Sequence, residues 1–213
     1  YYPIFKSINP IFIDDYTDYN WEWAAQQFWV NGSGTEEDPY IIENKIIDKQ
    51  WHAPCVEIRN SEKYFMISDC TLSTNDAIFP GIILYNVKNG VIKNNTIKTC
   101  HTGLEIFGNN EVNISLNHIN YNHIGIHLAQ SEKINISNNN IDHNNIGLDI
   151  YQSNNNLFHD NSLLDSESCI MEYESENNIF EGNICDQPPL KKLYMTITDQ
   201  IFTMDEFNIS FFI

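Results

Sequence analysis

Four segments of the sequence share one pattern: Gly81-Ile82-Ile83-Leu84, Gly103-Leu104-Glu105-Ile106, Gly125-Ile126-His127-Leu128 and Gly147-Leu148-Asp149-Ile150. Each copy of this Gly-apolar-x-apolar pattern begins 22 residues after the previous one. Other positions keep the same step, namely an Asn column and two apolar columns: Asn95, Asn117, Asn139, Asn161 and Asn183; Ile92, Ile114, Ile136, Phe158 and Phe180; Ile97, Ile119, Ile141 and Leu163. Several independent columns in one phase identify an internal repeat.

Within each repeat, apolar and polar residues alternate between Asn, Gly and Ser, which is typical of short strands separated by tight turns. A unit of this length cannot bury its apolar face alone, so equivalent strands must stack on those of neighbouring repeats. The pattern therefore predicts an all-β fold, a single-stranded parallel β-helix of about seven coils between Tyr40 and Gln187, with about 4.8 Å between coils. Asn tolerates left-handed backbone and its amide can bond the amides above and below, so the Asn column is interpreted as a buried structural corner.

The two ends of the chain differ from the repeat. Residues 1–39 are expected to form an N-terminal cap and leader, in which Asp18–Trp29 has the capping residue and apolar spacing of a short amphipathic helix. Residues 40–187 carry the β-helix repeats. Residues 188–213 are apolar but out of phase, and we expect a C-terminal cap or tail that covers the last coil or pairs with another chain.

The composition limits the classes of partner. The 213 residues include 29 acidic and 11 basic side chains, for a formal charge of −18. This surface would repel phosphate, so a nucleic-acid or anionic-membrane partner is not expected. No apolar run reaches the length of a membrane span, and the chain starts at Tyr1 without the basic region of a secretion signal.

The five cysteines lie at irregular spacing without a CxxC motif, which predicts neither a zinc site nor a disulfide framework. Cys55 and Cys169 occupy the slot of the repeat glycine, Cys70 an Asn-column slot, and Cys185 the slot of Leu163. They are interpreted as small buried residues and not as nucleophiles.

Units such as Gly81-Ile82-Ile83-Leu84-Tyr85-Asn86, followed by Asn94-Asn95-Thr96-Ile97, resemble the repeats of NosD-like proteins. The stretch Asn31-Gly32-Ser33-Gly34-Thr35 with Asp38-Pro39-Tyr40-Ile41-Ile42 is similar to the leader of archaeal secreted members. The resemblance covers about Asn31 to Asp186. It implies a right-handed helix, a carbohydrate-binding or sugar-hydrolase-related domain and an extracellular or cell-surface location, but no catalytic residue is carried over.

One outward column of the repeat reads Ile83, Glu105, His127, Asp149 and Met171. Glu105 and Asp149 would flank His127 on successive coils, about 9.6 Å apart. This set could bind a divalent metal, although no cofactor is required. It could instead act as acid and base, because its spacing is near that of inverting glycosidases. It could also be an exposed column in which His127 is held between two anions.

The next outward column reads Tyr85, Phe107, Ala129, Tyr151 and Tyr173, with Arg59 one coil earlier. Aromatic rings beside carboxylates are typical of a sugar-binding groove. The alternative is that a loop or the C-terminal tail covers these rings.

Three functions remain open from the sequence. The leading hypothesis is a secreted or surface β-helix that binds carbohydrate or another extracellular polymer without catalysis, because the turns are too short to build walls around a cleft. The first alternative is a polysaccharide hydrolase or lyase that uses Glu105, His127 and Asp149. The second is a structural or assembly module that forms oligomers through the C-terminal tail.

Overall fold

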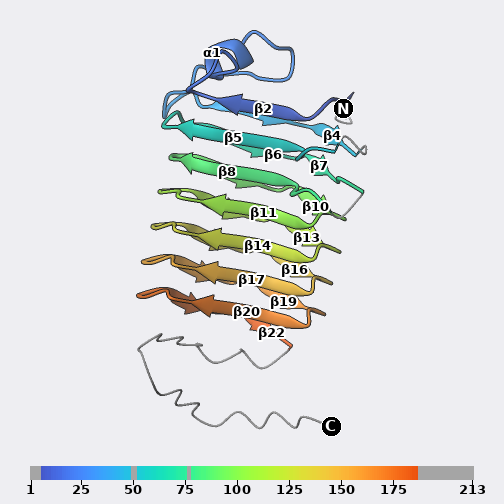
Figure 1. The fold of residues 1–213 in the computed structure, drawn as a ribbon, viewed down its shortest axis with the longest axis vertical. Helices are drawn as coiled ribbons and strands as arrows, with labels where there is room; N and C mark the ends of the chain where they lie inside the picture. The colour runs from blue at the N-terminus through green and yellow to red at the C-terminus, as the bar shows by residue number, and fades with distance from the viewer. Residues whose placement is uncertain (1–5, 49–51, 76–77, 187–213) are drawn as a thin grey trace, which may run out of the picture.

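A computed structural model describes residues 6–48, 52–75 and 78–186 as a solenoid of three parallel sheets (Figure 1). Sheet A contains β1 (Lys6–Ser7), β4 (Lys45–Ile47), β7 (Thr71–Leu72), β10 (Thr96–Lys98), β13 (His118–Asn120), β16 (Asn140–Asp142), β19 (Ser162–Leu164) and β22 (Ile184–Cys185). Sheet B contains β2 (Ile11–Asp14), β5 (Val56–Ser61), β8 (Ile82–Val87), β11 (Thr102–Phe107), β14 (Ile124–Ala129), β17 (Ile146–Tyr151) and β20 (Ser168–Tyr173). Sheet C contains β3 (Tyr40–Glu43), β6 (Phe65–Ser68), β9 (Gly90–Lys93), β12 (Asn113–Ser115), β15 (Asn135–Ser137), β18 (Leu157–His159) and β21 (Ile179–Glu181).

The all-β parallel β-helix expected from the repeat is confirmed, with the right-handed winding that the resemblance implied, but with about six turns in place of the seven expected. Each complete turn takes one strand from each sheet in the order B, C, A, so that six turns run from β5 to β22. Equivalent residues of the repeat pair directly, as in Leu104 with Ile126 and Ile126 with Leu148. These interior residues are at most 1% exposed. Stacking of identical slots therefore produces the core, as the 22-residue period requires.

The N-terminal end is closed by α1 (Trp21–Ala24), which Asn20 caps through a hydrogen bond from the Trp23 backbone N–H. Trp21 is fully buried, and its ring stacks on Tyr40 at 4.7 Å between centroids. Its indole N–H donates to Ser61 Oγ at 3.0 Å. The expected capping helix is present and short. Residues before position 40 also supply strands, since β1 pairs with β4 and β2 pairs with β5.

The Asn column forms a buried ladder at one corner of the coil. The Asn139 amide oxygen accepts from the backbone N–H and the side-chain amide of Asn117, at 2.9 and 3.0 Å. Its amide nitrogen donates to the carbonyl of Ile114 and to Asn161 Oδ1. The same pattern repeats along the column, so these side chains satisfy backbone groups that the turn would otherwise leave unpaired. Three further columns of this kind among the described residues were not expected from the sequence: Cys100, Asn122 and Asn144; Asn109, Ser131, Ser153 and Ser175; Ile134, Asn156 and Asn178.

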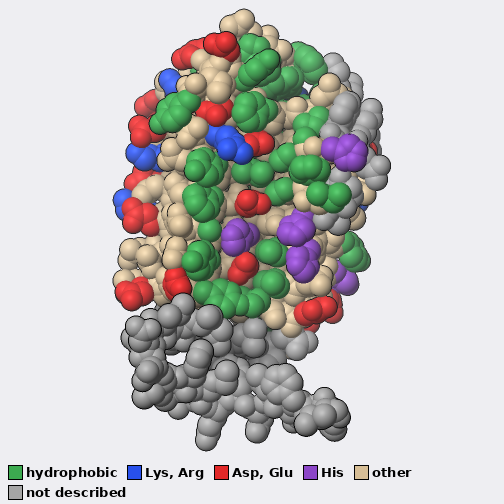
Figure 2. Space-filling model, viewed as in Figure 1, with side chains coloured by type: hydrophobic (Ala, Val, Ile, Leu, Met, Phe, Trp, Pro, Cys, Tyr) green, Lys and Arg blue, Asp and Glu red, His purple; other side chains and the backbone are tan. Residues whose placement is uncertain are grey.

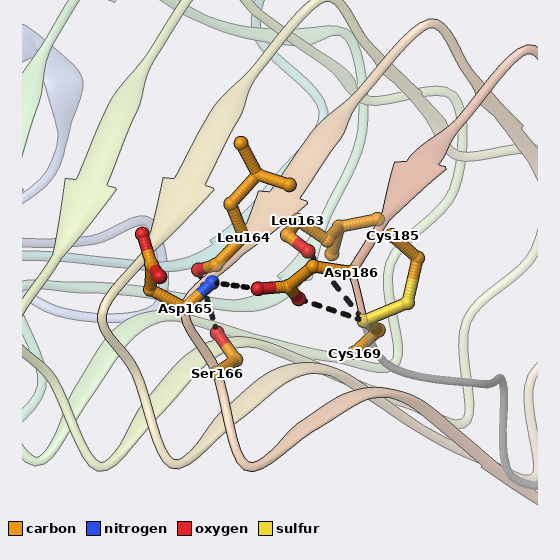
Figure 3. Close-up of a disulfide and its surroundings, with 7 residues drawn as sticks. All are labelled: Leu163, Leu164, Asp165, Ser166, Cys169, Cys185 and Asp186. Carbon is orange, nitrogen blue, oxygen red and sulfur yellow. Dashed lines mark hydrogen bonds between the residues drawn. A yellow bond between two sulfur atoms is a disulfide. The ribbon is translucent and has the colours of Figure 1, made fainter.

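The expectation of no disulfide is wrong for one pair, because Cys169 and Cys185 are bonded, with 6.1 Å between their Cα atoms (Figure 3). The reason lies in how the columns face each other across the coil. A Cβ on Gly147 would lie 2.9 Å from Leu163 Cδ2, so the glycine slot and the Leu163 slot are in contact. One turn later both slots hold cysteine. Cys55 and Cys70 are buried as expected, Cys100 is buried too, and burial raises the pKa of the Cys70 thiol to about 11.

The expected C-terminal cap or tail, residues 188–213, lies outside the described residues. Within those residues, no helix is long and apolar enough to cross a membrane.

Candidate functional site

The outward side of sheet B carries the two columns identified from the sequence. Strand side chains alternate between the two faces of a sheet, so Glu105, His127 and Asp149 point outward while their neighbours fill the core. Parallel pairing places Glu105 opposite His127, and His127 opposite Asp149, on successive strands. Figure 2 shows this face, with a row of hydrophobic side chains beside a row of acidic and histidine side chains.

His127 and Asp149 form the closest pair in this column. His127 Nδ1 lies 2.8 Å from Asp149 Oδ2, and the two side chains are 28% and 17% exposed. The hydrogen bond with Asp149 raises the pKa of His127 above its ordinary value, against a lowering by partial burial, and the charges of Asp149 and Glu105 raise it further. Because Nδ1 is engaged, Nε2 is the ring nitrogen left for another group. The dyad is therefore oriented as a general acid or base requires.

Tyr173 joins this pair electrostatically. Its pKa is raised first by burial and then by the negative charge of Asp149, so the two side chains lie within reach of each other's field. Tyr173 pairs with Tyr151 on the neighbouring strand, two positions along from Asp149. The sequence had assigned Tyr173 only to the aromatic column.

The structure groups fewer metal donors than the sequence suggested. Among the residues that the structure describes, no group of three His, Cys, Asp or Glu side chains is arranged to hold a metal ion. The His127–Asp149 pair supplies two donors by itself. A divalent metal at Glu105, His127 and Asp149 stays a prediction.

The aromatic column is a stack of flat groups along the solenoid. The Arg59 side chain is paired with Glu57, and its guanidinium lies 5.3 Å from the centre of the Tyr85 ring. Tyr85 in turn stacks on Phe107, with centroids 5.2 Å apart and planes at 2°. The two faces of Tyr85 are thus covered within the column. A sugar at this residue would contact the ring edge and the hydroxyl group.

The column is interrupted at one coil. Ala129 occupies the slot between Phe107 and Tyr151 and is 3% exposed, so the interruption is closed over and not an open notch. Tyr85 and Tyr151 are each 38% exposed. All five predicted ligand-binding residues, Arg59, Tyr85, Phe107, Tyr151 and Tyr173, lie in one column beside Glu105, His127 and Asp149.

A third outward column was not recognised in the sequence, and we call it the outer amide column: Asn60, Asn86, Gly108, Gln130, Gln152 and Glu174. Each member directly follows a residue of the aromatic column and has a left-handed backbone. Asn86 donates to Asn60 Oδ1 at 3.0 Å, and Gln130 donates to Gln152 Oε1 at 3.2 Å. The 22-residue step of these amides was the available signal.

Two cavities lie away from the His127–Asp149 pair. One of about 420 Å³ is near the N-terminal cap, where Trp23, Phe28 and Trp29 line it. Another of about 230 Å³ lies over the outer amide column at Gly108. A second imidazole–carboxylate pair, His118 with Asp142 at 3.2 Å, lies on the outside of sheet A and was not predicted. Of these features, the cavity at Gly108 is the one that adjoins the two predicted columns, because Gly108 directly follows Phe107 of the aromatic column.

The fold is shared with two solved structures at low sequence identity. One is ORF18 of Geobacillus virus E2, with a TM-score of 0.54 and 13% identity over 67% of this chain. The other is the A-module of the mannuronan C-5 epimerase AlgE4 of Azotobacter vinelandii, with a TM-score of 0.53 and 13% identity over 71% of this chain. This chain covers 37% and 43% of the lengths of those proteins. Identity at this level shows a common fold alone.

The family assignment comes from comparison of the sequence and not from the solved structures. No curated protein matches the chain significantly. The family described as the right handed beta helix region matches residues 27–196, well over half of the sequence. The stacked coils and the match together show that the chain belongs to the right-handed β-helix family.

Proposed function

We propose that the protein binds a carbohydrate polymer, through the outward face of sheet B, without turning it over. The observation that carries this proposal is the alignment of an aromatic column and a carboxylate–imidazole column over consecutive strands spaced about 4.8 Å apart. The partly exposed rings of Tyr85 and Tyr151 supply apolar contact. Glu105 and Asp149 supply acceptors for sugar hydroxyl groups. A straight array of this kind suits an extended polymer.

The charge favours a neutral glycan. The chain carries a net charge of −18, and Arg59 on this face is paired with Glu57. An acidic polysaccharide would be repelled unless cations intervened. The AlgE4 module is named for action on mannuronan, and its shared fold supports a polysaccharide partner here without supplying the same substrate.

An extracellular or cell-surface location is part of the proposal. The Cys169–Cys185 disulfide supports it, because such bonds persist in oxidising compartments. The repeat units around Gly81 and Asn94 support the finer NosD-like assignment within the β-helix family.

The test is binding to an array of neutral and acidic glycans, followed by titration calorimetry with the strongest ligand. Tyr151→Ala should weaken binding about fivefold, since one aromatic contact contributes about 1 kcal/mol. The matched control is Tyr121→Ala, because Tyr121 is 58% exposed and lies outside sheet B. Equal loss in both variants, or no glycan bound by the wild type, would contradict the proposal.

The oriented dyad favours one second candidate, a glycan-cleaving enzyme. His127 is held by Asp149 at 2.8 Å, and Glu105 lies two coils from Asp149, about 9.6 Å by coil spacing. That separation is near the upper end of the ~6.5–9.5 Å used by inverting glycosidases. Incubation of the bound glycan with wild type and with Asp149→Asn, followed by chromatography, separates the two functions. Product formed by wild type alone would establish catalysis, and intact glycan in both samples would leave binding as the function.

A further inference from the structure

The outer amide column has a fixed hydrogen-bond direction on its N-terminal side. A carboxylate only accepts hydrogen bonds, so an amide beside it must present its NH₂ group. Asn60 donates to Asp14 Oδ1 at 2.9 Å. Asn60 Oδ1 is thereby turned toward Asn86, which donates to it. The Asn86 amide oxygen consequently faces onward, toward the coil of Gly108.

On the C-terminal side of the outer amide column the amides donate in the opposite direction, toward the C-terminal end of the solenoid. Glu174 is the carboxylate at this end, and Gln152 donates to its Oε2 at 2.6 Å. Gln130 donates to Gln152 in the same direction. The Gln130 amide oxygen therefore faces back toward the coil of Gly108. Neither this oxygen nor that of Asn86 accepts a hydrogen bond from another described residue.

Gly108 separates these two halves, and neither backbone nor packing requires a glycine there. Its φ of 67° is close to the 52° of Asn86 and the 48° of Gln130, which carry side chains at the same slot. A Cβ added to Gly108 would have one neighbouring atom, the Asn86 backbone nitrogen, at 4.0 Å. The missing side chain leaves a gap in the column, with an acceptor oxygen facing it from each side.

The gap adjoins a cavity of suitable size and polarity. The cavity of about 230 Å³ is lined by Asn60, Asn86, Gly108 and Asn110 and by the ion pair of Glu62 with Lys88. It lies on the Asn86 side of the gap, and Gln130, on the other side, is not part of its lining. It is smaller than the ~300–1,000 Å³ of drug-sized pockets, which suits a single sugar unit. Gly108 directly follows Phe107, so the gap lies at the edge of the aromatic column.

We infer that the gap at Gly108 is a subsite for one hydroxyl-bearing unit of a neutral glycan, whose hydroxyl groups donate to Asn86 Oδ1 and Gln130 Oε1. The ligand class rests on the proposed carbohydrate binding. The coils of Asn86 and Gln130 are about 9.6 Å apart. Both amide oxygens only accept hydrogen bonds, so a polyhydroxy molecule, which carries several O–H donors, suits the pair.

The test fills the gap. Gly108→Asn places at this slot the residue that Asn60 and Asn86 already carry with the same backbone, and its amide could donate to Asn86 Oδ1. We expect the strongest array glycan to bind at least tenfold more weakly, by calorimetry, while the melting temperature is unchanged or higher. The control is Asn138→Gln, which changes another exposed amide with left-handed backbone, outside sheet B and away from the gap, and should change the affinity less than twofold.

The outcomes separate this inference from the proposed function. Glycan binding that is weakened by Gly108→Asn, together with a ligand-induced shift of the Gly108 amide resonance, supports the subsite. Unchanged affinity in Gly108→Asn and an unshifted Gly108 resonance would overturn the subsite and leave binding on sheet B intact. Failure of the wild type to bind any glycan would overturn both.

Discussion

The interior and the outer surface of the same strands obey different rules. Inside, a slot holds nearly the same residue in every coil, as in the Asn ladder through Asn117, Asn139 and Asn161. Outside, the residue changes from coil to coil, as in Glu105, His127 and Asp149. Stacking demands identity inside because each residue packs on its own equivalent. Outside, that demand is absent, so interruptions and charges there are free to serve binding.

The two amide ladders show the contrast within one type of side chain. The buried Asn ladder is continuous, and its amides satisfy backbone groups. The outer amide column is exposed at Asn86 and Gln130 and is broken at Gly108. A break in the buried ladder would leave unpaired polar groups in the core, whereas a break outside leaves them to water or a ligand. The following substitutions test this difference.

The largest effect is expected from Asn139→Leu. The change leaves the Asn117 N–H and the Ile114 carbonyl without their partners in the interior. The free energy of unfolding should fall by about 4 kcal/mol, measured by urea denaturation. Asn140→Leu, on the exposed side of the next position, should change it by less than about 0.5 kcal/mol. Similar losses in the two variants would contradict the distinction between inside and outside.

Loss of the disulfide should come next. Cys169→Ser opens a link between residues 16 apart in sequence, which should lower the unfolding free energy by about 3 kcal/mol. Adding a thiol reductant to the wild type should reproduce the shift in melting temperature. A reductant-insensitive melting curve would show that the two cysteines are not bonded in solution.

A pair of glycine substitutions measures the same contrast through packing. In Gly125→Ala, the new Cβ would lie 2.6 Å from both the Gly147 carbonyl oxygen and Ile141 Cγ2. Such overpacking should reduce stability by about 2 kcal/mol. Gly108→Ala meets open space and incurs only the left-handed backbone strain of about 1 kcal/mol. Thermal denaturation of both variants checks the order, and a larger loss at Gly108 would reverse it.

The smallest effect concerns pH. The raised pKa of His127 means that its contribution to stability is fully present below its ordinary pKa near 6.5 and is lost as pH rises through the folded pKa. Asp149→Asn should lower the pKa of His127, measured by NMR titration of its ring protons. The stability difference between wild type and Asp149→Asn should be about 1 kcal/mol or less at pH 6 and should shrink by pH 8. A difference that grows with pH would contradict the assigned pair.

The fold could be predicted from the sequence because stacked coils require the same residue types at positions 22 residues apart. The register of Glu105, His127 and Asp149 followed from that period, and the pairing confirms it. The Cys169–Cys185 bond did not follow, because the period says which residues stack but not which columns face each other across the coil. The stacking of Tyr85 on Phe107 also depends on side-chain orientation, which spacing does not encode.

The outer amide column was missed for a related reason. Its members differ in type, with Asn60, Asn86, Gln130, Gln152 and Glu174 interrupted by Gly108, so no single letter marks it. The gap at Gly108 is recognised only through the carboxylates of Asp14 and Glu174, which set the direction of the hydrogen bonds at the two ends of the column. That direction becomes visible only when the side chains are placed.

The most direct test of carbohydrate binding on the outward face of sheet B is an amide NMR titration with the strongest glycan from the array. The account predicts that shifts will gather on β8, β11, β14 and β17 and on Gly108, with sheets A and C unaffected. Shifts centred on sheet A or sheet C, or no shift with any glycan, would contradict it.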